Sequence, residues 1–292
     1  MSAWVLGVIG GSGLYEIPGL EGEWRTVDTP WGAPSDQLFD GRLGDQRVVF
    51  LPRHGRGHRI PPSALNFRAN IDALKRLGVT DVLSLSACGS LREDRPPGAF
   101  VVVDQFIDRT FAREKSFFGP GLVAHVSMAH PVCPRLSALA AAAGRAVGAD
   151  VHDGGTYLVM EGPQFSTQAE SKLYRSWGCD VIGMTNMPEA KLAREAELPY
   201  ASVAMVTDYD CWREETEAVT VANVLEVLHA NSGKARALVA HLAGRLATIP
   251  RPPSPIDTTL DVALITAPEA RDPALMAKLD AVAGRVLKVA VS

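Results

Sequence analysis

Residues 5–13 read Val-Leu-Gly-Val-Ile-Gly-Gly-Ser-Gly, a short apolar run that leads directly into a glycine-rich turn. Apolar runs of similar length recur along the chain, and helical patterns separate them. This alternation predicts an α/β fold, a single domain in which helices flank a central mixed β-sheet. The expected strands are Val5–Ile9, Arg47–Leu51, Asp81–Leu85, Phe100–Val103, Tyr157–Met160, Asp180–Ile182 and Ala201–Val206.

The first expected helix follows Ser63, a residue type that favours the N-cap position. Phe67, Ile71 and Leu74 would then share one face, which is the spacing of an amphipathic helix. Gly78 stands where a C-terminal stop belongs, because glycine adopts the left-handed conformation at little cost.

Three further helices are predicted. Residues 167–170, Thr-Gln-Ala-Glu, have the spacing of a capping box and open a helix that should end near Gly178. An Ala-rich helix is expected at Leu136–Val147, and a long amphipathic helix at Val221–Ala247.

The C-terminal part of the chain is set apart by residues 250–255, Pro-Arg-Pro-Pro-Ser-Pro, which have the composition of a linker. A short strand at Val262–Thr266 and a helix at Pro273–Val286 are expected after it. The prediction is a main domain over residues 1–249. Residues 250–292 form an extension packed on that core or on a neighbouring subunit, because about 40 residues are close to the limit of independent stability.

The 292 residues include 29 Lys and Arg against 33 Asp and Glu, a formal net charge of −4. This balance, with no block of basic residues, argues against nucleic acid as a partner. The four cysteines contain no C-x-x-C pair, which argues against a zinc ribbon or a dithiol site. The first four residues do not resemble a signal peptide, and the longest apolar stretch, Ala138–Gly144, is far shorter than the roughly 18 residues of a membrane span. We expect a soluble, cytoplasmic protein with no membrane partner.

The glycine-rich turn at residues 10–13 has two interpretations. Glycines allow backbone N–H groups to converge on an anion, and the Ser12 hydroxyl adds a donor. A plain strand-exit turn is the alternative. A dinucleotide fingerprint is excluded because its third glycine position is Glu16, and a Walker loop is excluded because the Gly-Lys pair at residues 233–234 lacks the following Ser or Thr.

Residues 53–58, Arg-His-Gly-Arg-Gly-His, come directly after the strand expected at Arg47–Leu51. Cationic and imidazole groups at the C-terminal end of a strand suit a phosphate or carboxylate ligand, whereas the alternative is a solvated basic loop. Arg-His-Gly is also typical of histidine phosphatases, in which His54 would be the nucleophile. That family needs a second, late histidine, and both His229 and His241 lie in an ordinary helical pattern.

Small, polar or ring-stacking residues also end four other expected strands, at residues 83–92, 161–165, 181–189 and 206–212. Because the carboxyl ends of parallel strands meet at one edge of a sheet, the six strand ends predict one shared site above that edge. For Phe165 and Met184, which belong to this set, plain core packing is the alternative.

Asp208 and Asp210 are two residues apart and fall on the same side of an extended chain. A metal site is not predicted, because no histidine or third carboxylate stands at ligand spacing. The pair matches a heterocycle that offers a ring N–H beside an exocyclic amine. A solvated acidic turn is the alternative.

At these same residues the sequence resembles the 5′-methylthioadenosine phosphorylases, the trimeric branch of the purine nucleoside phosphorylase superfamily. The resemblance covers about residues 5–245 in order and spacing, and it does not extend convincingly into the final 40 or so residues. It rests on the stretches GVIGGSGL, DTPWGAPSD (residues 28–36), RHGRGH, NFRANIDALK, ACGSLRED, DQFIDRT, EGPQFSTQAES and VTDYDCW.

The resemblance implies a phosphate site formed by Ser12, Arg53, His54, Ser86, Ala87 and Thr185. It also implies that Phe165 contacts the purine ring and that Met184 contacts the ribose. Asp208 and Asp210 would face purine N7 and the 6-amino group, and Tyr209 belongs to the same substrate-binding set.

Specificity for a methylthio group is assigned by the same resemblance to Ser166, Val221, Val224 and Leu225. His125 lies where the family has a histidine that reaches into the neighbouring subunit's site. Gly183 departs from the family pattern, because some relatives have Asn there.

The implied reaction is phosphorolysis of S-methyl-5′-thioadenosine by inorganic phosphate to adenine and 5-methylthioribose 1-phosphate, in methionine and purine salvage. Phosphate is a co-substrate, and no metal or organic cofactor is expected. Asp208, with its pKa raised by burial beside Asp210, is the expected general acid at N7. A homotrimer is implied. A histidine phosphatase and a non-catalytic nucleoside sensor remain as other function classes, and phosphate-independent adenine release would indicate a hydrolase.

Overall fold

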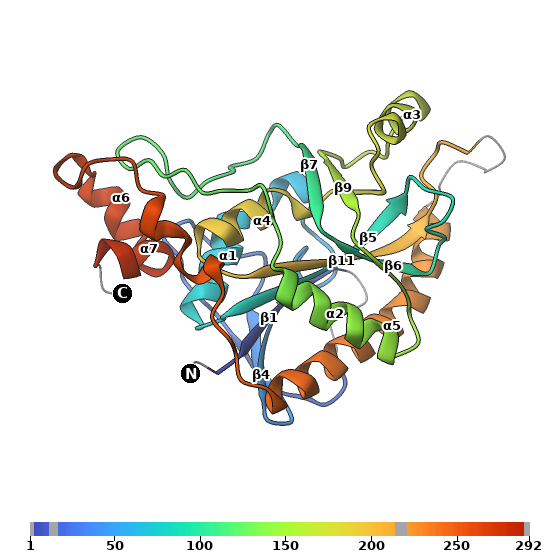
Figure 1. Cartoon of the computed structure of the whole chain (residues 1–292), viewed down its shortest axis with the longest axis horizontal. Coiled ribbons are helices and arrows are strands. Elements are labelled where there is room, and N and C mark those ends of the chain that lie inside the picture. Colours follow the sequence, from blue (N-terminus) through green and yellow to red (C-terminus); the bar gives the residue numbers. More distant parts are fainter. Residues whose placement is uncertain (1–2, 12–16, 214–220, 289–292) are drawn as a thin grey trace.

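The computed structural model describes residues 3–11, 17–213 and 221–288. Within them, eleven strands form one sheet and helices cover both of its faces (Figure 1). The predicted class, a single α/β domain with a mixed sheet flanked by helices, is confirmed. The strands are β1 (Val5–Gly10), β2 (Leu20–Arg25), β3 (Leu38–Leu43), β4 (Gln46–Pro52), β5 (Asp81–Ser90), β6 (Ala99–Val103), β7 (Gln105–Arg109), β8 (Asp150–Asp153), β9 (Thr156–Met160), β10 (Val181–Gly183) and β11 (Tyr200–Asp208).

The centre of the sheet is a run of parallel strands. β1 pairs in parallel with β4 on one side and with β5 on the other, and β5 pairs in parallel with β11. Antiparallel pairs surround this run, namely β2 with β3, β3 with β4, β10 with β5, and β11 with β6. Because β1, β4, β5 and β11 run in the same direction, their C-terminal ends meet at one edge of the sheet.

Two layers of helices bury the two faces of this sheet (Figure 1). The α2 helix (Pro134–Ala146) and the α5 helix (Val221–Thr248) pack on one face, and the α1 helix (Phe67–Arg76) and the α4 helix (Asn186–Glu195) pack on the other. Successive side chains of β4 point to opposite faces of the sheet and pack into both cores. Val48 and Phe50 join the core on the α2 and α5 side, whereas Val49 and Leu51 join the core on the α1 and α4 side. In the described part of the chain, no helix is long and apolar enough to cross a bilayer.

The α1 helix begins at a different cap from the one predicted. Ser63 lies in the 3₁₀ turn η1 (Pro62–Ala64), and its hydroxyl donates to the carbonyl of Glu161 at 3.0 Å. Asn66 caps α1 instead, because its Oδ1 accepts the N–H of Ala69 at 3.1 Å. The predicted stop at Gly78, which has a φ of +75°, is confirmed. The capping box predicted at residues 167–170 is also confirmed, at the start of α3 (Gln168–Ser176).

Four strands have no counterpart in the prediction: β2, β3, β7 and β8. Polar and half-exposed residues make up much of these strands, so they lack the apolar run that identifies a buried strand. β3 contains Asp40 and Gly41, residue types depleted in strands, and pairs with β4 across a two-residue turn at Gly44. β5 is also longer than predicted and continues to Ser90.

The C-terminal segment differs most from the prediction. The strand expected at Val262–Thr266 is replaced by the 3₁₀ segment η2 (Pro255–Val262) and a single bridge between Ala124 and Leu264. The expected last helix is broken at Leu279 into α6 (Pro273–Lys278) and α7 (Asp280–Leu287). The break places Asp280 at the start of α7, where its carboxylate pairs with Arg76 of α1.

Buried contacts tie this segment to the main sheet. Arg251 donates through Nε to Asp81 Oδ2 at 2.5 Å and through Nη1 to Asp257 Oδ2 at 3.0 Å. Leu279 and Val282 are buried in the same hydrophobic cluster that contains α1. The division of the chain at residue 250 remains a prediction.

Candidate active site

A cavity of about 590 Å³ opens where β1, β4, β5, β9, β10 and β11 end. The residues that line it range from Gly11 to Asp210, because the strand order brings together segments that are far apart in sequence. The predicted site residues in its wall are Arg53, His54, Ser86, Ala87, Phe165, Met184, Thr185, Asp208 and Asp210.

Arg53 is held by a buried carboxylate, and its side chain is only 1% exposed. Its Nε and Nη2 donate to the two carboxylate oxygens of Glu189 at 2.8 and 3.2 Å. Nη2 also donates to Ser84 Oγ at 2.6 Å, and Nη1 donates to the Leu85 carbonyl at 3.0 Å. Burial lowers the pKa of Arg53, but the Glu189 carboxylate outweighs this and keeps that pKa above its ordinary value. Arg53 is therefore a fixed cation whose charge Glu189 balances.

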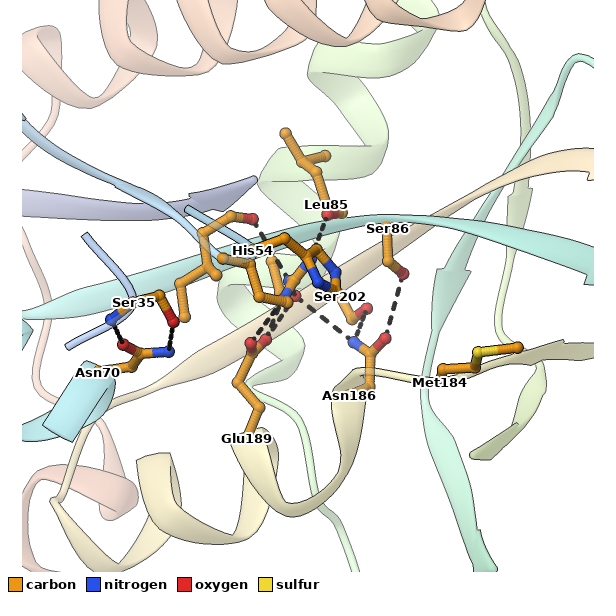
Figure 2. A network of polar contacts seen from close by, with 12 residues as sticks. Ser35, His54, Asn70, Leu85, Ser86, Met184, Asn186, Glu189 and Ser202 are labelled. Carbon is orange, nitrogen blue, oxygen red and sulfur yellow. Dashed lines mark hydrogen bonds and ion pairs between the residues drawn. The ribbon is translucent and has the colours of Figure 1, made fainter. Parts of the chain in front are cut away.

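A chain of hydrogen bonds continues from Glu189 to the cavity wall, and Figure 2 shows its last part, at Asn186, Ser202 and Ser86. Tyr200 donates its hydroxyl hydrogen to Glu189 Oε1 at 2.8 Å and accepts from Asn186 Nδ2 at 2.8 Å. Asn186 Nδ2 also donates to Ser202 Oγ at 2.6 Å. Asn186 Oδ1 accepts from Ser86 Oγ at 3.1 Å, so the chain ends at a predicted phosphate-binding residue.

His54 is buried and electrically neutral near neutral pH. Its Nδ1 lies 2.8 Å from the carbonyl oxygen of Ile60, which can only accept, so Nδ1 carries the hydrogen. Its ring stacks on His58 with centroids 4.3 Å apart. Burial, assisted by the charge of Arg53, lowers the pKa of His54 to about 4. The remaining nitrogen, Nε2, is therefore a hydrogen-bond acceptor.

Thr185 lines the cavity, and its hydroxyl oxygen is buried. Its side chain is buried at the N-cap of α4, yet it makes no cap hydrogen bond. Among the described residues its Oγ1 has no hydrogen-bond partner. Because leaving a buried polar group unpaired costs free energy, this hydroxyl is suited to a bound ligand.

Asp208 and Asp210 place two carboxyl groups where β11 ends, the first partly buried and the second buried. Asp208 accepts the N–H of Asp210 through Oδ1 and the hydroxyl of Thr207 through Oδ2, both at 2.7 Å. Burial raises the pKa of Asp208 despite these two hydrogen bonds, and burial together with the neighbouring Asp208 charge raises the pKa of Asp210. Gly89 leaves room for the pair, since a Cβ there would stand 3.0 Å from Asp208 Oδ1. Perturbed carboxyl groups in a cavity are typical of proton-transfer sites.

Phe165 and Met184 occupy the cavity wall on two different loops. Phe165 is 48% exposed, which does not agree with plain core packing. Arg113 ties these loops together, because its Nη1 donates to the carbonyls of Met184 and Met187 at 2.7 and 2.6 Å and its Nη2 donates to the carbonyl of Glu161 at 2.8 Å. The backbone that carries Met184 is thus fixed by a buried cation.

The departure at Gly183 has a physical explanation. A Cβ at this position would stand 1.8 Å from the hydroxyl oxygen of Tyr157, a distance at which no side chain fits. Tyr157 is fully buried, and its hydroxyl lies 3.4 Å from Ser86 Oγ. The phenol therefore fills the space that an Asn side chain at residue 183 would need.

Three predicted residues are not among those that line the cavity. Tyr209 donates to the carbonyl of Glu93 at 3.4 Å, and the hydroxyl of Ser166 lies 3.7 Å from Met160 Sδ. His125 is exposed on the surface of this chain. Their roles remain predictions.

The side chains of four other predicted residues lie outside the described part of the structure. Ser12 lies outside the described residues. Val221, Val224 and Leu225 form the start of α5, but their side chains lie outside what the structure describes. The phosphate and methylthio contacts assigned to these four residues remain predictions.

The residues that sequence analysis missed are the partners of the predicted ones. Glu189 and Asn186 lie in the polar stretch at residues 181–189, but the sequence pattern assigns neither of them a role. The available signal was Arg53, because a cation at a buried strand end requires a carboxylate partner. In the described residues, no group of three or more His, Cys, Asp or Glu side chains is placed to hold a metal ion.

Comparisons with known proteins agree with this geometry. The family model described as the phosphorylase superfamily matches residues 5–243. The S-methyl-5′-thioadenosine phosphorylase of Cereibacter sphaeroides is 65% identical over 286 residues, which is 97% of this chain and 99% of that protein. The family model thus ends close to the expected limit of about residue 245, whereas this pairwise alignment also includes most of the C-terminal segment.

Solved structures give the same result. A methylthioadenosine phosphorylase from an Antarctic soil metagenomic library superposes with a TM-score of 0.90 at 45% identity, over 96% of this chain and 99% of that chain. A variant of the Schistosoma mansoni adenosine/methylthioadenosine phosphorylase, in complex with methylthioadenosine, has a TM-score of 0.79 at 39% identity, over 85% of this chain and 93% of that chain. The chain therefore belongs to the phosphorylase superfamily and, within it, to the S-methyl-5′-thioadenosine phosphorylases.

Proposed function

We propose that this protein catalyses the phosphorolysis of S-methyl-5′-thioadenosine to adenine and 5-methylthioribose 1-phosphate. One observation carries the proposal: a single cavity is lined by Arg53, His54 and Thr185, which we name the anion subsite, and by the carboxyl groups of Asp208 and Asp210. Nucleoside phosphorolysis needs both, because phosphate must be positioned and the departing base must gain a proton. The proteins similar to this chain carry the name of the same reaction.

The proposed mechanism requires no covalent bond to the enzyme. The bond between ribose C1′ and adenine N9 breaks as a phosphate oxygen forms a bond to C1′, and the phosphate charge stabilises the cationic sugar. Asp208 donates its proton to N7 of the departing adenine, and burial, which raises the pKa of Asp208, favours the protonated form that this step needs. Arg53 and the Thr185 hydroxyl orient the phosphate.

The same proposal places the nucleoside along the cavity wall. Phe165 packs against the purine, Met184 contacts the ribose, and Asp210 accepts from the 6-amino group. The remaining assigned residues complete the site: Ser12, Ser86 and Ala87 for phosphate, Tyr209 for the nucleoside, and Ser166, Val221, Val224 and Leu225 for the methylthio group. We also propose a homotrimer in which His125 reaches a neighbouring site, and a cytoplasmic location.

The test is adenine release from S-methyl-5′-thioadenosine with and without phosphate. Release that requires phosphate supports the proposal. Release without phosphate identifies a hydrolase, and binding without release in the presence of phosphate identifies a sensor. A phosphohistidine at His54, formed without any nucleoside, identifies a phosphatase.

A further inference from the structure

The direction of each hydrogen bond behind the anion subsite follows from Glu189. This carboxylate pairs with Arg53 and is 2% exposed, so its oxygens only accept. Tyr200 therefore donates its single hydroxyl hydrogen to Glu189 Oε1, at 2.8 Å. Tyr200 must in turn accept from whichever Asn186 atom lies 2.8 Å away.

That requirement fixes the orientation of the Asn186 amide. The atom that faces Tyr200 has to be the donor, Nδ2, and Nδ2 also donates to Ser202 Oγ at 2.6 Å. Oδ1 consequently faces Ser86, whose hydroxyl lies 3.1 Å away (Figure 2). Because an amide oxygen can only accept, Ser86 donates its one hydroxyl hydrogen to Asn186 Oδ1.

Ser86 is left with lone pairs only. The Tyr157 hydroxyl, 3.4 Å from Ser86 Oγ, can donate to one of them, because burial raises the pKa of Tyr157 and keeps the phenol protonated. The other lone pair remains for the cavity that Ser86 lines. A predicted phosphate-binding hydroxyl therefore faces the ligand as an acceptor.

His54 adds a second acceptor to the same subsite. Its Nδ1 hydrogen is committed to the carbonyl of Ile60, which leaves Nε2 with a lone pair. The charge of Arg53 is already balanced by Glu189. A fully deprotonated oxyanion would meet two lone pairs here, whereas an oxyanion that carries hydrogen would donate to them.

We propose that the anion subsite selects an oxyanion that carries a hydrogen, because Asn186 turns Ser86 into an acceptor for a P–OH group. The proposal rests on the proposed function and deepens it. It predicts that phosphate and arsenate bind well and that sulfate, which carries no hydrogen at neutral pH, binds poorly. With the P–OH group at Ser86, an unprotonated phosphate oxygen is left to attack C1′.

The experiment measures the affinities of phosphate, arsenate and sulfate for the free protein by calorimetry. For the wild-type protein we expect sulfate to bind at least about tenfold more weakly than phosphate, and arsenate to bind comparably to phosphate. Arsenate is larger than phosphate, so selection by size alone would reject it. Sulfate that binds as tightly as phosphate would overturn the proposal.

Two variants test the role of the Asn186 amide. Asn186→Leu frees the Ser86 hydrogen for the anion, so the ratio of sulfate to phosphate dissociation constants should fall toward one. Ser86→Ala removes the lone pair and should lower the same ratio, which provides a test even where Asn186→Leu does not fold. Ser35→Ala is the matched control, since that buried hydroxyl bonds Asn70 at 2.9 Å, and its ratio should equal that of wild type.

A ratio that stays at the wild-type value in both site variants would contradict the inference. Adenine release by the wild-type enzyme is measured in parallel. Phosphate-dependent release tests the proposed function alone, whereas the anion affinities test the selection of a hydrogen-carrying oxyanion without turnover. A failure of the proposed function and a failure of the proposed anion selection therefore give different results.

Discussion

The guanidinium of Arg53 and the carboxylate of Glu189 form a two-bond ion pair, at 2.8 and 3.2 Å, with both side chains almost completely buried. The pair joins the end of β4 to the first turn of α4 beneath the cavity. Removing one member leaves the other charged and without this partner in surroundings that are almost completely buried. Arg53 thus joins two elements of the fold and also lines the cavity.

We expect Arg53→Ala to lower the free energy of unfolding by about 3–5 kcal/mol, the cost of breaking a buried pair. The matched control is Arg145→Ala, because Arg145 pairs with Asp153 at 2.5 Å on the surface. That exposed pair should be worth less than about 1 kcal/mol. Chemical denaturation of both variants is the measurement, and equal losses would show that burial of the Arg53 pair has no consequence.

The close approach of Tyr157 to Gly183 predicts a strong coupling between these positions. Gly183→Ala should cost at least about 2 kcal/mol, because the new Cβ meets the phenol oxygen. In a Tyr157→Leu background the same change should cost less by at least about 1 kcal/mol. Gly233→Ala, at a helical glycine with no atom within 4 Å of the added Cβ, is the control and should stabilise the protein slightly. Additive costs in the double variant would refute the coupling.

Base selectivity tests the roles of the two carboxyl groups. A carboxylate at Asp210 accepts from a 6-amino group but opposes a 6-oxo group, and such a mispaired buried group costs about 1–3 kcal/mol. Methylthioinosine should therefore be a poor substrate. Asp208→Asn should lose activity on S-methyl-5′-thioadenosine, because the proton for N7 is gone. The difference in kcat/KM between S-methyl-5′-thioadenosine and methylthioinosine should therefore become smaller. The measurement is kcat/KM for both nucleosides, and a wild type that cleaves both equally well would contradict the assignment.

The raised pKa of Glu195 predicts that the free energy of unfolding depends on pH. This buried carboxyl group, at the end of α4, accepts from the Ser116 hydroxyl and the Phe117 N–H, both at 2.7 Å. Burial nevertheless raises the pKa of Glu195 from 4.5 to about 7. Because the native state favours the protonated form, this stabilisation is complete below pH 4.5 and is lost as the pH rises through 7.

Glu195→Gln removes that titration and serves as the reference. The unfolding free energy of wild type minus that of the variant should fall by about 3 kcal/mol between mildly acidic and mildly alkaline pH. Denaturation curves across this range provide the measurement. A difference that stays constant or rises with pH would show that Glu195 is ionised throughout.

The sequence predicts well those strands that are buried on both faces of the sheet, where water is excluded. β1, β4 and β11 are nearly continuous apolar runs, so burial alone identifies them. β2 and β8 are half-exposed and polar, and they form because a neighbouring strand offers backbone partners. The broken helix at Leu279 is likewise set by a tertiary contact, the pairing of Asp280 with Arg76.

The candidate site shows the same division. Arg53, Asp208 and Asp210 are recognisable because charged groups follow apolar strands. Their partners are not, since Glu189 lies 136 residues from Arg53 and Asn186 lies 100 residues from Ser86. Local spacing carries no information on which carboxylate or amide the fold will bring to a given side chain.

The central claim is that this cavity joins phosphate to the sugar while it releases adenine. The most direct test is to count phosphate consumed and adenine formed in one reaction with S-methyl-5′-thioadenosine. We predict one phosphate consumed per adenine, with all of it recovered as a sugar 1-phosphate. Adenine formed with the phosphate concentration unchanged would contradict the account.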